Sequence, residues 1–86
     1  MSFDPFTLVI MDIFGKKYNV FCLGNDHTIE YIKFILSEKT GIDREEITLI
    51  MGSTKLQGYS KFKDYSIHKD SRIRMLVSMK SGLNYF

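Results

Sequence analysis

Residues 28–41 read TIEYIKFILSEKTG, and this stretch has the pattern of an amphipathic helix. Thr28 is a residue type that favours the N-cap, and Glu30 lies in the first turn, where a negative charge is stabilising. One apolar stripe at helical spacing consists of Ile29, Ile32 and Leu36. Gly41 is the residue type that ends helices at the C′ position. The stretch therefore predicts a helix over residues 29–40 with one buried face.

Two apolar runs precede this helix: TLVIMDIF at residues 7–14 and YNVFCL at residues 18–23. They are joined by Gly15-Lys16-Lys17, and β-rich runs around a short glycine-containing turn are typical of a β-hairpin. The sequence GNDH at residues 24–27 has the composition of a loop. The chain therefore begins with a hairpin that leads through a polar loop into the helix.

After the helix, residues 47–51 (ITLIM) predict a short strand, followed by a turn and a brief strand at Lys55-Leu56. Residues 57–66 are polar and irregular, and their aromatic side chains, Phe62 and Tyr65, are the expected anchors. Residues 73–77 (IRMLV) predict a last strand. The order ββαββ favours an α+β domain in which one helix covers a mixed sheet and the first and last strands pair in parallel.

The composition fits one small domain: 86 residues, of which 44% are hydrophobic and 26% charged. No apolar run approaches the ~18 residues of a membrane span, and the first residues lack the features of a signal peptide. The single cysteine, Cys22, cannot form an internal disulfide, which is typical of a reducing compartment. We therefore expect a cytoplasmic or nuclear protein without a membrane partner.

The charges are unevenly distributed, although the net charge is only +2. Residues 1–46 hold five basic and eight acidic side chains, whereas residues 47–86 hold seven basic and two acidic ones. Such an asymmetry can steer an acidic partner. The small net charge and the lack of a readable aromatic platform do not favour nucleic acid, so RNA binding is only a weaker alternative.

Several short motifs share the spacing of a known family. They are Thr28-Ile29-Glu30, Ile32-Lys33, Leu36, Lys39-Thr40-Gly41-Ile42, Leu49-Ile50, Gly52, Leu56 and Asp64-Tyr65-Ser66-Ile67. Through them the chain resembles the ubiquitin-like, β-grasp domain family over residues 7–82, without a gap. The resemblance implies a sheet of about five strands that grasps one helix. It divides the chain into an N-terminal extension (1–6), a ubiquitin-like domain (7–80) and a C-terminal tail (81–86).

The resemblance and the two-residue alternation of strands together predict which side chains face the helix. The expected core consists of Val9, Met11, Phe21, Leu23, Ile29, Ile32, Leu36, Leu49, Leu56, Phe62, Ile67, Ile73 and Met75. The opposite, open face is expected to carry Leu8, Ile10, Val20, Cys22, Ile50 and Leu76. A half-covered sheet normally shows polar residues on its open face, so this apolar set indicates a binding surface.

The resemblance also implies where partners bind. The central isoleucine of the family's apolar patch matches Ile50, its last-strand valine matches Leu76, its basic neighbour matches Arg74, and its hairpin-tip leucine matches Phe14. Thr48 and Gly52, on either side of Ile50, complete the expected patch. Leu8 and Ile10 are expected to extend it as a secondary apolar surface. Self-association through this face should be weak, so we expect a monomer at micromolar concentration.

The main hypothesis is a non-enzymatic interaction module, the N-terminal domain of a larger shuttle or adaptor in the ubiquitin–proteasome system. Its partners would be ubiquitin receptors, proteasome subunits or ubiquitin-binding domains. One alternative is a modifier processed after Gly82, although the family's paired glycines are Ser81-Gly82 here. Another is the ubiquitin-like splicing modifier that acts without a diglycine tail. The residues similar to that protein are Gly15-Lys16-Lys17, Val20, Cys22 and Tyr65-Ser66-Ile67-His68.

The sequence does not suggest enzyme chemistry. Cys22 lies within a predicted strand, and His27 and His68 lie in loops, so no base is expected beside the thiol. The histidines and carboxylates do not have metal-ligand spacing. We therefore expect no catalytic residue, no metal and no cofactor.

Overall fold

A computed structural model of the chain describes residues 5–78. Its elements are β1 (Phe6–Met11), β2 (Lys17–Cys22), α1 (Ile29–Thr40), β3 (Ile47–Met51), β4 (Thr54–Lys55) and β5 (Ile73–Val77), with short 3₁₀ helices η1 (Arg44–Glu46) and η2 (Phe62–Tyr65). The predicted bounds of the helix are confirmed. The strands follow the predicted sequence, with the brief strand at Thr54–Lys55 and not at Lys55-Leu56, so the order is ββαβββ. The predicted tail, 81–86, lies outside the described residues.

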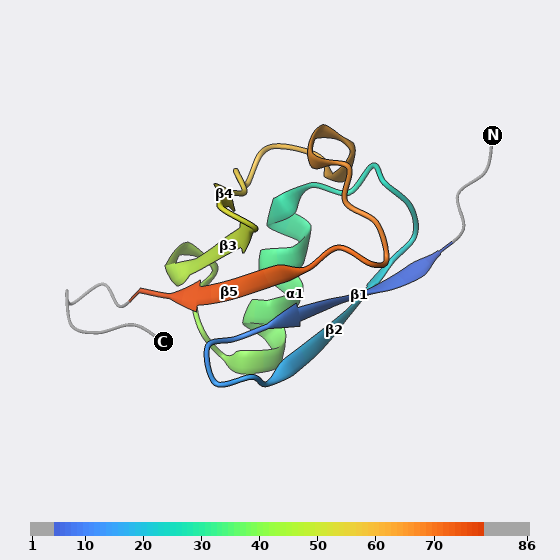
Figure 1. Cartoon of the computed structure of the whole chain (residues 1–86). Coiled ribbons are helices and arrows are strands. Elements are labelled where there is room, and N and C mark those ends of the chain that lie inside the picture. The colour runs from blue at the N-terminus through green and yellow to red at the C-terminus, as the bar shows by residue number, and fades with distance from the viewer. Residues whose placement is uncertain (1–4, 79–86) are drawn as a thin grey trace.

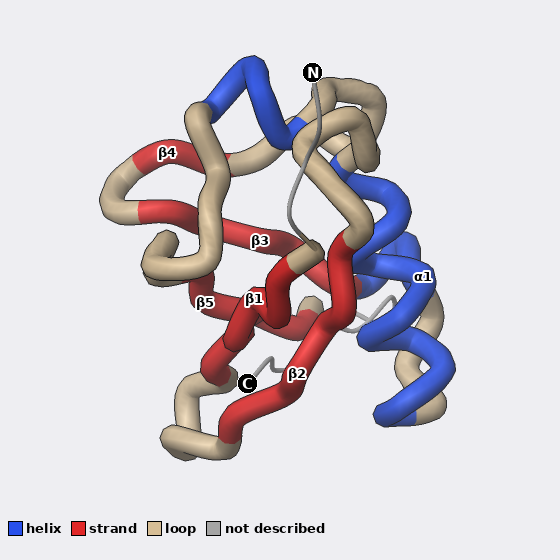
Figure 2. The backbone as a smooth tube through the Cα atoms, turned by 90° about the vertical axis from the view of Figure 1, so that its right-hand side faces the viewer, coloured by secondary structure: helices blue, strands red, loops and turns tan. Residues whose placement is uncertain are grey.

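The five strands form one mixed sheet in the order β2-β1-β5-β3-β4. β1 and β5 are parallel, and the other neighbouring strands are antiparallel. Figure 1 shows α1 behind the sheet, and the turned view in Figure 2 shows it on one side only. The predicted α+β, β-grasp arrangement is confirmed, including the parallel pairing of the first and last strands.

Both ends of α1 are fixed by backbone groups. Thr28 occupies the predicted N-cap position, but its side chain makes no capping hydrogen bond. Instead, the N–H of Ile29 donates to the carbonyl of Ser60 (2.9 Å), and the N–H of Glu30 donates to that of Gly58 (3.0 Å). The irregular segment before η2 thereby satisfies donors that a helix start leaves unpaired. At the other end, Gly41 adopts a left-handed conformation with φ 80°.

The apolar core lies between the sheet and α1. Its buried members are Leu8, Ile10, Val20, Cys22, Ile29, Ile32, Leu36, Ile47, Leu49, Leu56, Phe62, Ile67, Ile73, Met75 and Val77. The predicted core residues from α1 onward are therefore all confirmed, and the anchor Tyr65 packs against them. The hairpin is different: the exposed fractions of Val9, Met11, Phe21 and Leu23 are 37, 38, 57 and 62%. Their predicted core positions are wrong.

A shift of one residue explains this inversion. Successive side chains of a strand point to opposite faces, so a one-residue slip moves a whole set to the other face. The gapless match from residue 7 placed both hairpin strands one residue out of phase with the structure. Both alternating sets of residues in β1 contain apolar side chains, so β1 alone does not reveal which set is buried. In β2, however, Lys17 and Asn19 belong to the same alternating set as Phe21, and all three are exposed.

The corrected faces predict a contrast between two neighbouring residues of β1. Ile10→Ala removes a fully buried side chain and should lower the free energy of unfolding by about 2–5 kcal/mol. Val9→Ala changes the open face and should cost about 1 kcal/mol or less. Urea denaturation followed by circular dichroism measures both. Equal losses, or a larger loss at Val9, would contradict the assignment of the faces.

Candidate protein-binding surface

The open face of the sheet carries one row of side chains that crosses all five strands. Strand pairing places Lys17 opposite Met11, Met11 beside Arg74, and Arg74 opposite Ile50, which in turn lies opposite Lys55. Directly opposed residues share a face, so these five side chains form what we call the cross-strand row. The row alternates basic and apolar residues and contains no carboxylate.

Four of the six predicted patch residues meet on this face. Ile50 pairs with Arg74 and Thr48 pairs with Leu76 across β3 and β5. Ile50, Thr48 and Leu76 are half-buried, and Arg74 is exposed. Half-buried apolar side chains beside an exposed guanidinium provide contact area together with a donor for a carboxylate. The structure therefore places these four residues side by side on the open face. Partner binding by them stays a prediction.

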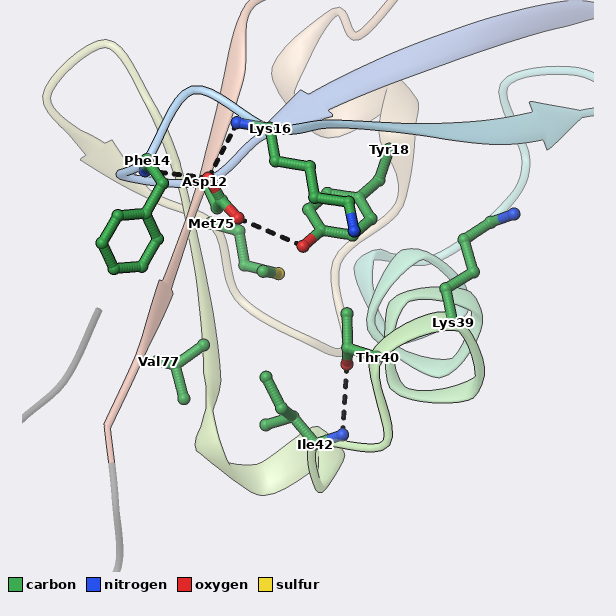
Figure 3. Close-up of a pocket in the computed structure, with 9 residues that line it drawn as sticks. All are labelled: Asp12, Phe14, Lys16, Tyr18, Lys39, Thr40, Ile42, Met75 and Val77. Atoms are coloured by element: carbon green, nitrogen blue, oxygen red, sulfur yellow. Dashed lines mark hydrogen bonds between the residues drawn. The ribbon is translucent and has the colours of Figure 1, made fainter.

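The remaining two patch residues lie in turns. Gly52 has φ 66° in the turn between β3 and β4, a conformation that glycine adopts without strain. Phe14 lies at the hairpin tip and is 73% exposed. It borders a hollow of about 320 Å³ on the helix side, together with Met75 and Val77. Figure 3 shows this hollow between the hairpin and the end of α1. Phe14 thus neighbours the covered face of β5.

Asp12 shapes the hairpin tip. Its Oδ1 accepts hydrogen bonds from the N–H groups of Phe14 (2.8 Å) and Lys16 (2.9 Å), and its Oδ2 accepts one from the hydroxyl of Tyr18 (3.1 Å). These bonds fold residues 12–16 into a loop, so β1 ends at Met11 and not at the predicted residue 14. The loop fixes the register in which Lys17 faces Met11.

The predicted secondary surface needs a correction. Leu8 and Ile10 are fully buried beneath α1 and cannot extend the patch. The open face of the hairpin instead carries Val9, Met11 and Phe21, whose predicted core positions are wrong. The predicted processing site, Gly82, lies outside the described residues.

Comparison with known proteins agrees with this architecture. The ubiquitin-like modifier HUB1 of Saccharomyces cerevisiae is 29% identical to the chain over 68 residues, which are 79% of this chain and 92% of HUB1. The mixed five-stranded sheet over one helix has the arrangement that this likeness implies. The chain has the ubiquitin-like, β-grasp fold, and its likeness to HUB1 supports a place in that family. No family model matches it.

In this ubiquitin-like protein, His27 has a structural role. Its Nε2 accepts a hydrogen bond from the N–H of Leu23 (3.0 Å). Its ring stacks on Tyr31 with 4.0 Å between centroids, and its carbonyl accepts from the N–H of Phe62 (2.8 Å). The hydroxyl of Tyr31 donates to the carbonyl of Phe21 on β2. His27 therefore ties β2, α1 and η2 together.

Cys22 is not arranged for nucleophilic chemistry. It is fully buried, and burial raises the pKa of its thiol to about 11. Its sulfur lies 3.5 Å from the carbonyl of Val20, the acceptor of its weak hydrogen bond. Within residues 5–78 no three His, Cys, Asp or Glu side chains are grouped to hold a metal ion, and no helix is long and apolar enough to cross a membrane.

The raised pKa values predict weaker folding in alkali. Burial raises the pKa of Cys22 from 9.0 to about 11. Burial also raises the pKa of Tyr18 and of Tyr31. Because the unfolded chain loses these protons first, stability should be intact below pH 9 and fall as the pH rises toward 11. The thiol alone accounts for roughly 2–3 kcal/mol.

Cys22→Ala isolates the thiol contribution. The variant starts from a lower stability because it lacks buried volume, but its loss between pH 9 and pH 11 should be smaller than that of the wild type. Urea titrations at several pH values measure both slopes. Parallel curves for the two proteins would contradict the prediction.

Proposed function

We propose that this ubiquitin-like protein acts without conjugation, as a modifier of the splicing type that binds partner proteins through its open sheet face. The observation that carries the proposal is the uncovered apolar and basic face around Ile50, with Leu76 and Arg74 beside it. The likeness to HUB1, which is named a modifier, supports the proposal. So do the motifs shared with the splicing-type protein, Gly15-Lys16-Lys17 and Tyr65-Ser66-Ile67-His68.

The likeness to HUB1 favours the splicing-type alternative over the hypothesis of a shuttle or adaptor domain. The match spans 92% of HUB1, so it supports a role built on the ubiquitin-like domain itself. A shuttle or adaptor role with proteasome partners stays a prediction. A splicing-type role would place the protein in the nucleus, which is within the expected cytoplasmic or nuclear distribution.

A small half-buried patch supports weak binding. Interfaces of this size give dissociation constants on the order of 100 μM, or about −5.5 kcal/mol. Truncating a central anchor typically costs about 2 kcal/mol, which is roughly thirtyfold in affinity. Loss of one side chain at the centre of the patch should therefore abolish detectable binding.

Ile50→Ala tests the proposed surface. We expect the wild-type protein, immobilised through a terminal tag, to retain spliceosomal proteins from a nuclear extract, and Ile50→Ala to retain none, because the patch loses its central contact. Phe34→Ala is the matched control, because Phe34 is an exposed apolar residue on α1. Quantitative mass spectrometry compares the three baits, and amide shifts confirm that each is folded.

Two results would overturn the proposal. Retention of proteasome subunits or ubiquitin receptors in place of spliceosomal proteins would restore the shuttle hypothesis. Equal retention by wild type and Ile50→Ala would show that the open face around Ile50 is not the binding surface.

The proposal also predicts that the chain is not charged by a ubiquitin-type activating enzyme. Ser81 replaces the first of the family's paired glycines, Ser78 replaces the basic residue that activating enzymes read, and four residues follow Gly82. A thioester assay on the full chain and on a chain truncated after Gly82 should give no product. Efficient thioester formation by the truncated chain would establish the processed modifier as the better alternative.

A further inference from the structure

The hairpin half of the open face contains a second concave site, separate from Ile50. It is a hollow of about 520 Å³ lined by Val9, Met11, Lys17, Ser71, Arg72, Ile73 and Arg74. Ligand sites in proteins typically have volumes of about 300–1,000 Å³, so this hollow has room for several side chains of a partner. β1 and β5 supply its floor, and the start of β2 and the loop before β5 supply its rim.

The charged side chains that line this hollow are all basic. Three exposed cations, Lys17, Arg72 and Arg74, line it together with the apolar residues Val9, Met11 and Ile73. The ion pairs found among residues 5–78 join Arg44 to Glu30 and Lys63 to Asp26, so none of them neutralises the hollow.

The acidic residue that follows Met11 does not line this hollow. The two carboxylate oxygens of Asp12 accept hydrogen bonds from the N–H groups of Phe14 and Lys16 and from the hydroxyl of Tyr18, within the hairpin. The lining therefore combines an apolar floor with a positive rim and contains no carboxylate, and a partner that supplies carboxylates would complement it.

We propose that this hollow binds an acidic segment of a partner protein, with an apolar side chain seated on Val9 and Met11 and carboxylates beside Lys17 and Arg72. The inference rests on the proposed function, because it specifies the chemistry of the partner. Exposed arginine and lysine would also attract RNA phosphates. The floor, however, is aliphatic and lacks the aromatic side chains on which bases stack, so the lining favours a peptide.

The test uses the full chain labelled with ¹⁵N and three probes of equal length. They are a synthetic peptide that alternates Glu with Leu, the same peptide with Lys for Glu, and an oligouridine RNA. We expect only the acidic peptide to shift the amides of Val9, Met11 and Arg72, and its binding to weaken as salt is raised.

A charge-reversal variant localises the binding. Lys17→Glu/Arg72→Glu turns two attractive contacts into repulsive ones and should lower affinity for the acidic peptide by about tenfold or more. Lys33→Glu/Lys61→Glu makes the same change in net charge at two positions outside the lining, on α1 and before η2, and should alter affinity by less than about twofold. Amide spectra of both variants verify that they are folded.

The outcomes separate this inference from the proposed function. Ile50→Ala should abolish retention of the partner but leave binding of the acidic peptide in place. If RNA binds and the acidic peptide does not, or if both charge-reversal variants bind the peptide as the wild type does, the inference is overturned while the result for Ile50 stands independently. Retention of the natural partner by Lys17→Glu/Arg72→Glu at the wild-type level would also overturn it.

Discussion

The rest of the structure depends on the burial of four hairpin side chains, Leu8, Ile10, Val20 and Cys22, beneath α1. A domain of this size has a thin core, so each of these side chains contributes a large part of the apolar area that α1 covers. Because side chains alternate along a strand, their burial forces Val9, Met11 and Lys17 onto the opposite face. The composition of the open face is thus a consequence of how the core packs.

The loop between β2 and α1 holds β2 in its register relative to the helix. His27 accepts the N–H of Leu23 just after β2 and stacks on Tyr31 in the first turn of α1. Tyr31 in turn bonds to the carbonyl of Phe21, so the end of β2 is held to the helix at two points. A slip of β2 by one residue would break both bonds and expose Val20 and Cys22. The contacts of His27 and Tyr31 therefore hold Val20 and Cys22 on the buried face and also fix the start of the helix.

The sequence predicts this molecule best where the signal is local. The bounds of α1 follow from apolar spacing and from Gly41, and the faces of β3 and β5 follow from alternation between apolar and other residues. The faces of the hairpin could not be predicted in this way, because both alternating sets of residues in β1 contain apolar side chains and the family resemblance runs through the hairpin without a gap. Lys17 and Asn19 in β2 were the available signal. The cross-strand row could not be predicted from the sequence, because it depends on the register of five strands that are distant in sequence.

The register also limits how a partner can use the open face. Ile50 on β3 and Lys17 on β2 are separated by three strand spacings, or about 14 Å at ~4.8 Å per spacing. No single partner side chain spans that distance, so a ligand that depends on both halves must lie across the strands. Arg74 lies beside both Met11 and Ile50 at the midpoint of the cross-strand row. A substitution at Arg74 would therefore weaken binding at both the hairpin hollow and the surface around Ile50. A substitution at Lys17 would affect only the hollow, and one at Ile50 only the surface around it.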